Sequence, residues 1–157
     1  MGSRYYVYPH VKRRVVFYLA SVLDLHSRKI VGYSFSRSMT TELVIKAFNN
    51  AQISQKPSEG LVLHTDLGSQ YTSSEFTQHI QNHHIKQSFS QKDCPYDNAC
   101  IESFHALLKK EEVNHVQYLD YQTAKLAMFQ FIEEKRIHSS LGYLNPTGHR
   151  NRIRNTA

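Results

Sequence analysis

The sequence predicts an α/β fold, a mixed five-stranded sheet flanked by helices, and two observations carry this prediction. Stretches with strand and helix patterns follow one another in the order three strands, helix, strand, helix, strand, helix, an order typical of an α/β sheet. At 157 residues with 40% hydrophobic content, the chain has the length and composition of one domain with its own core. No internal repeat or low-complexity tract divides it.

The first half of the chain supplies three of the expected strands. Val15–Leu25 is rich in Val, Tyr and Leu, and Lys29–Ser36 alternates in polarity, so the pair predicts a hairpin. A short β-prone piece precedes it and ends at Pro9. The expected elements are strands over 5–8, 15–25 and 29–36, then a helix from Thr40 or Thr41 to about Ala51.

The centre of the fold is predicted at Leu61–His64, a short apolar run typical of a buried strand. Asp66 follows it, and Gly68 lacks a Cβ and so permits a tight turn. Thr72 and Glu75 have the spacing of a capping box that opens a helix. The remaining expected elements are a helix over about 72–84, a strand over 85–90, a helix within DNACIESFHALLKKEE, and a helix over about 123–136.

Two carboxylates form the candidate site. Asp66 is expected at the C-terminal end of the central strand, where open α/β sheets place their ligands. Glu102 follows after 35 residues, near the first turn of its helix, on a stripe with His105 and Lys109. Mg²⁺ prefers oxygen ligands and uses few carboxylates together with substrate phosphates, so this pattern suits a metal site that also holds phosphate. Caps or solvated surface acids are the alternative interpretation.

The charge distribution indicates a polyanionic partner. The net charge is +6. Residues 1–40 hold seven Lys/Arg and one acid, and residues 135–157 hold five Lys/Arg and no acid. Residues 41–134 hold seven Lys/Arg and twelve acids. An acidic centre between basic ends suits a polyanion lying across a carboxylate site, although a basic tail alone also serves solubility or belongs to a disordered segment. Without an 18-residue apolar run or a signal-type segment, we expect a soluble, cytoplasmic protein with no membrane partner.

Three blocks of the sequence closely resemble the integrase core of insertion-sequence transposases, the branch akin to retroviral integrases. They read HTDLGSQYTSSEF, SFSQKDCPYDNACIESFHALLKKE and RIHSSLGYLNP, and the resemblance runs from about Val15 to Pro146. It implies an RNase H-like fold, with residues 1–146 as a catalytic core-like domain and 147–157 as a basic C-terminal tail. In that family three acids bind two Mg²⁺ ions; Asp66 matches the second acid and Glu102 the third.

The resemblance implies DNA strand cleavage and transfer by phosphoryl transfer, with Mg²⁺ or Mn²⁺ as cofactor, in a prokaryotic cytoplasm and at the nucleoid when DNA is bound. The implied partner is DNA, as transposon ends and target, beside a second copy of the chain or a DNA-recognition domain encoded upstream. We interpret the histidines near the acids as structural. The expected DNA-binding residues are Lys109, Lys110, Tyr71, Asn98, Arg13 and Arg14.

The chain departs from the family at the first acid. Residues Arg4 to Tyr6 occupy the neighbourhood where that Asp is expected, and no acid occurs before Asp24, which matches another position at the end of the second strand. The resemblance therefore predicts a core that is truncated at its N-terminus and impaired in catalysis, or one whose first strand is encoded upstream. A non-catalytic remnant that binds DNA or a full-length transposase is the alternative.

Overall fold

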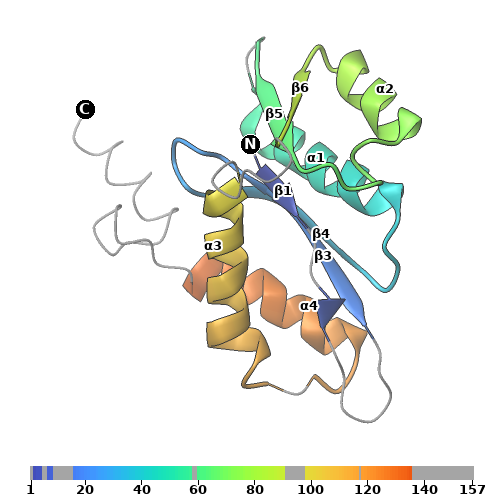
Figure 1. Cartoon of the computed structure of the whole chain (residues 1–157). Coiled ribbons are helices and arrows are strands. Elements are labelled where there is room, and N and C mark those ends of the chain that lie inside the picture. The colour runs from blue at the N-terminus through green and yellow to red at the C-terminus, as the bar shows by residue number, and fades with distance from the viewer. Residues whose placement is uncertain are drawn as a thin grey trace, which may run out of the picture.

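The computed structural model of the chain describes residues 2–4, 7–8, 16–57, 60–90, 98–116 and 118–135. Within these ranges the elements alternate between strands and helices, as the sequence predicts for an α/β protein (Figure 1). None of the described helices is long and apolar enough to cross a membrane.

A long antiparallel hairpin forms the centre of the first sheet. Its strands are β3 (Phe17–Leu23) and β4 (Ile30–Ser36), whose partners run from Tyr18 opposite Ser36 to Leu23 opposite Ile30. The other edge of β3 pairs with two short strands, β1 (Gly2–Arg4) and β2 (Val7–Tyr8), both antiparallel. The predicted hairpin is confirmed. Of the first strand predicted over 5–8, the structure describes β2, and β1 lies before that range.

A second, parallel sheet carries the candidate site. It consists of β5 (Val62–Thr65) and β6 (Lys86–Phe89). Strand β1 contacts β5, and the two lie side by side in Figure 1. The described residues nevertheless form a four-stranded and a two-stranded sheet, because no ladder of paired residues joins β1 to β5. The predicted five-stranded sheet is therefore not confirmed.

The helices pack on both sides of the hairpin and generate two hydrophobic cores (Figure 1). Because side chains alternate along a strand, β3 sends Leu19 and Leu23 into one core and Ala20 and Val22 into the other. The helices are α1 (Thr41–Gln55), α2 (Ser74–Asn82), α3 (Ala99–Leu108) and α4 (Tyr121–Gln130), with π-helical turns at Lys109–Val113 and Phe131–Lys135. Helices α1 and α2 enclose one core, and α3 and α4 enclose the other.

Two local details depend on single residues. A Cβ on Gly32 would lie 2.4 Å from the carbonyl oxygen of Ala47, so only glycine lets α1 approach β4 this closely. Helix α2 begins one residue later than the capping-box prediction, because Ser73 is the N-cap and its Oγ accepts a 3.2 Å hydrogen bond from the amide of Phe76. The expected cap at Thr72 is therefore wrong.

Candidate metal and nucleic-acid site

Asp66 follows the last residue of β5 and is held by the turn that it begins. The backbone amide of Gly68 donates a 2.9 Å hydrogen bond to its Oδ1. A Cβ on Gly68 would lie 2.8 Å from that same oxygen, so the glycine is needed for close approach to the carboxylate. Tyr71 completes the turn by donating its amide to the Gly68 carbonyl at 2.9 Å. The chain thus fixes one carboxylate at the end of a strand.

Glu102 lies in the first turn of α3 and is partly buried. The helix is anchored through Ile101, Phe104 and Leu108, which are nearly inaccessible and belong to the core shared with α4. Neighbouring positions on a helix differ by 100°, so these anchors turn Glu102 away from the centre of that core. The predicted helix and the place of Glu102 within it are confirmed.

Hydrogen bonds connect the end of β5 to the start of α3. The amide of Ser90 donates to the carbonyl oxygen of Thr65 at 2.9 Å, directly before Asp66. Ser90 Oγ accepts a hydrogen bond from Asn98 Nδ2 at 2.5 Å, and Asn98 is the N-cap of α3. Two bonds at one serine therefore join the strand of Asp66 to the helix of Glu102.

Asp66 and Glu102 carry oxygen donors of the kind that Mg²⁺ prefers. Among the described residues, no group of three or more His, Cys, Asp or Glu is arranged to hold a metal. Two carboxylates with water and phosphate oxygens are a common environment for a single Mg²⁺. A pair of ions roughly 3.5–4 Å apart needs further bridging carboxylates to offset the repulsion between them. Two carboxylates are therefore fewer ligands than a pair of ions requires.

Asp24, the first acid in the sequence, is engaged within its own turn. It lies in the turn after β3, where its carboxylate accepts hydrogen bonds from Ser27 Oγ at 2.6 Å and from the amides of His26 and Ser27 at 3.2 Å. Partial burial raises the pKa of Asp24, but these hydrogen bonds lower it more, so its pKa lies below the ordinary value. Its oxygens are engaged in closing the hairpin. The described part of the first strand, β1, ends at Arg4.

Comparison with known proteins identifies the family of the chain. Two family models, both described as integrase core domain, match residues 6–95 and 83–146. The chain belongs to the integrase core domain family. It is 42% identical over 133 residues to the transposase of insertion sequence element IS904 from Lactococcus lactis, covering 82% of this chain and 53% of that protein. It is 37% identical to the Escherichia coli transposase InsF of IS3A, covering 82% of this chain and 46% of that protein. This integrase core thus spans about half the length of these relatives.

Solved structures show the same fold. The catalytic core domain of HTLV-2 integrase, in complex with magnesium, matches with a TM-score of 0.65 at 17% identity, covering 94% of this chain and 92% of that one. The BIV integrase catalytic core domain matches with a TM-score of 0.64 at 15% identity, covering 99% and 95%. The integrase core therefore has the RNase H-like α/β fold of retroviral integrase catalytic cores.

The expected DNA-binding residues differ in how far they are exposed to solvent. Lys109 and Lys110 lie in the π-helical turn after α3, with Lys110 exposed and Lys109 partly exposed. Tyr71 is fully buried and packs edge-on against Phe76, so its prediction as a DNA contact is wrong. The turn after Asp66 folds the ring into the core. The predictions for Arg13 and Arg14 lie outside the described residues.

Two further side chains near the acids are buried. Asn98 is 7% exposed, and its use as a DNA contact stays a prediction. His105 is fully inaccessible and packs against Phe104 at a ring-centroid distance of 5.1 Å, in agreement with a structural role. The stripe of Glu102, His105 and Lys109 is therefore not a continuous solvated face.

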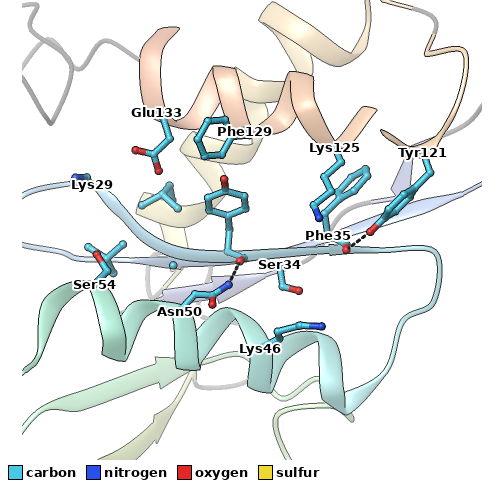
Figure 2. A pocket seen from close by; sticks show the side chains of 14 residues that line it. Lys29, Ser34, Phe35, Lys46, Asn50, Ser54, Tyr121, Lys125, Phe129 and Glu133 are labelled. Atoms are coloured by element: carbon cyan, nitrogen blue, oxygen red, sulfur yellow. Dashed lines mark hydrogen bonds between the residues drawn. The ribbon is translucent and has the colours of Figure 1, made fainter. Parts of the chain in front are cut away.

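A cavity of about 480 Å³ lies elsewhere, over β4 between α1 and α4 (Figure 2). Its wall includes Asn50, whose Nδ2 donates to the Tyr33 carbonyl at 2.8 Å, and Tyr121, whose hydroxyl donates to the Phe35 carbonyl at 2.7 Å. Burial, and then the charge of Glu133, raise the pKa of Tyr33 to about 12, so its hydroxyl stays neutral. Neither candidate acid lines this cavity, and we do not include it in the site.

The connection through Ser90 is the functional feature that the sequence did not reveal. Ser90 and Asn98 are ordinary loop and cap residues by type, and nothing in their spacing predicts that they meet. Their contact depends on the parallel register of β5 and β6, which places Thr65 opposite Phe89 and so brings the next residue to the end of β5. Strand pairing of this kind requires the fold.

Proposed function

We propose that this chain is the catalytic core of a transposase that cleaves and joins DNA strands by metal-dependent phosphoryl transfer, with Asp66 and Glu102 as its metal ligands. One observation carries the proposal: the Asp66 carboxylate is fixed at a strand end by Gly68, and the helix of Glu102 is tied to that same strand end. Fixed oxygen donors on separate rigid elements are what a metal site requires.

The relatives supply the class of reaction. The proteins of 37–42% identity are named as insertion-sequence transposases, and one similar integrase core is described in complex with magnesium. This chain spans about half the length of those transposases, and we propose that it shares their activity and acts on DNA. The proposed cofactor is Mg²⁺ or Mn²⁺, and the proposed partner is DNA.

The roles of the side chains follow from their chemistry. Asp66 and Glu102 hold the ion, and the Gly68 amide keeps one oxygen of Asp66 in place. A bound divalent ion supplies a Lewis acid that stabilises charge on the reacting phosphodiester oxygens. Lys109 and Lys110 bind phosphate groups of the DNA, and Asn98 is a further proposed DNA contact at the start of α3. With ligands for only one ion, the reaction is expected to be slow.

The test is Mn²⁺ binding by calorimetry together with strand transfer on a double-stranded oligonucleotide. We expect weak binding of one Mn²⁺ and little strand transfer, with both lost in Asp66→Asn and Glu102→Gln. Glu111→Gln is the matched control, because Glu111 is an exposed acid at the end of the same helical segment. Mn²⁺ binding that survives in Asp66→Asn would contradict the proposal.

The second candidate is a DNA-binding remnant without catalysis, and the absence of a third acid near the pair among the described residues favours it. Such a remnant would act by binding DNA or a full-length transposase. It predicts DNA binding that is unaffected by chelation and by Asp66→Asn. The same experiments therefore separate the two functions.

A further inference from the structure

The imidazole of His64 lies between Ser88, in the neighbouring strand β6, and Ser90, the residue that follows β6. Its Nδ1 is 3.2 Å from Ser88 Oγ and its Nε2 is 3.1 Å from Ser90 Oγ. The register of the parallel sheet places His64 directly opposite Ser88, so Ser90 is the next residue on the same face. The ring is partly buried and spans the two hydroxyl groups.

Ser90 is the point at which three elements meet. Its amide binds the Thr65 carbonyl at 2.9 Å, its Oγ lies 3.4 Å from that same carbonyl oxygen, and Asn98 Nδ2 donates to Oγ at 2.5 Å. In the tautomer of His64 that carries its proton on Nε2, Ser90 Oγ accepts from Nε2 and from Asn98 Nδ2 and donates its hydrogen to the Thr65 carbonyl, which uses all three bonding positions of the hydroxyl. The hydroxyl is thereby fixed in direction.

The Asn98 side chain contacts Ser90 and does not cap the helix. Asparagine at an N-cap normally accepts a hydrogen bond from the first turn, but the Asn98 side chain makes no cap hydrogen bond. Its Nδ2 is directed to Ser90, and Oδ1 is buried with no hydrogen-bond partner among the described residues. Asn98 therefore serves as a tether between α3 and the sheet.

We propose that His64 and Ser90 are positioning residues that hold the first turn of α3, through Asn98, at the end of β5. This inference rests on the proposed function, because the tether matters for catalysis only if Asp66 and Glu102 share an ion. Neither residue touches the ion. Both act by limiting the movement of Glu102 relative to Asp66, as residues outside the ligand set commonly do in metal sites.

The test compares variants that cut the tether with one that leaves it intact. Ser90→Ala removes the hydroxyl that receives Asn98, and His64→Phe keeps a ring but loses both hydrogen bonds. His64→Gln retains a donor and an acceptor and is the conservative rescue. Ser88→Ala is the matched control, because it removes the other bond of the same imidazole and leaves Ser90 and Asn98 joined.

Two measurements are made on each variant of the full chain. The first is amide hydrogen exchange of Ser103 and Phe104 without metal, because their hydrogen bonds close the first turns of α3. The second is the Mn²⁺ dissociation constant. We expect Ser90→Ala and His64→Phe to speed exchange and to weaken Mn²⁺ binding by about tenfold each. His64→Gln and Ser88→Ala are expected to stay within about threefold of the unmodified chain.

The double variant His64→Phe/Ser90→Ala is expected to weaken binding no more than either single change, since both break one tether. Equal effects of Ser88→Ala and Ser90→Ala would overturn the proposal, because the strand as a whole and not the tether would then be responsible. Unchanged exchange in Ser90→Ala would overturn it as well. If the unmodified chain bound no Mn²⁺ while the exchange results held, the proposed function would fail and the tether would stand.

Discussion

The amide of Gly68 and the carboxylate of Asp66 are 2.9 Å apart, and the bond between them fixes the direction of the acid that follows β5 in this integrase core. A Cβ at this position would lie 2.8 Å from Asp66 Oδ1, well inside ordinary contact distance, so any other residue would push the carboxylate aside. The carboxylate is thus oriented by the backbone two residues later.

We therefore expect Gly68→Ala to displace the Asp66 carboxylate and to weaken Mn²⁺ binding by about tenfold, the size of effect seen when a partner of a metal ligand is lost. Gly60→Ala is the matched control. Gly60 has a φ of 87° and open space around its Cβ position, so alanine there strains the backbone far from the acids. Titration of both variants with Mn²⁺ checks this, and equal losses would refute the role of Gly68.

Asp24 gives a prediction about pH. Its folded pKa is lower than its unfolded value of about 3.9, so its stabilising contribution is complete above that value and is lost as pH falls through the folded pKa. Asp24→Asn should lower the melting temperature by about 1–3 °C at pH 7, and the difference should shrink as the pH falls below about 4. Calorimetry across pH measures this. Unchanged Mn²⁺ binding in the variant would confirm that Asp24 is no metal ligand.

The substitution Tyr71→Phe is expected to lower the stability of the fold without changing its affinity for DNA. Because its side chain is fully buried, Tyr71→Phe should cost about 1 kcal/mol of unfolding free energy through loss of the buried hydroxyl group. The affinity of the folded chain for duplex DNA should be unchanged. Denaturant unfolding and a DNA titration of the same preparation test both statements. A weaker affinity in the folded variant would mean that the ring reaches DNA after all.

Lys109 and Lys110 predict a change in salt dependence. If both neutralise phosphates, replacing both with glutamine should reduce the slope of log affinity against log salt by about 1.8, because each contact contributes about 0.9. The double variant Lys46→Gln/Lys125→Gln is the matched control, since these lysines line the cavity between α1 and α4. Equal changes in slope would show that net charge alone governs binding.

The sequence predicted those parts of the fold that depend on local pattern. The apolar run before Asp66 became β5, and the periodic segment with Glu102 became α3. The errors arose where tertiary contacts decide. Tyr71 is polar enough for a surface, yet the turn at Gly68 directs it into the core beside Phe76. The tether from Ser90 to the helix depends on strand register, which no local pattern records.

The last prediction concerns the missing acid. Strand β1, which ends at Arg4, contacts the strand that leads to Asp66, so an aspartate introduced at Arg4, Tyr5 or Tyr6 tests whether this neighbourhood can supply a third ligand. Two ions roughly 3.5–4 Å apart repel each other and need a bridging carboxylate, and a lysine or arginine in that place repels a cation further. One of the variants Arg4→Asp, Tyr5→Asp and Tyr6→Asp is expected to bind a second Mn²⁺ and to gain strand-transfer activity over the unmodified chain.

The same variant combined with Asp66→Asn should lose the gain, because the new ligand is useful only beside the old ones. Robust activity in the unmodified chain that disappears in Asp24→Asn would show instead that the first acid lies in the hairpin turn.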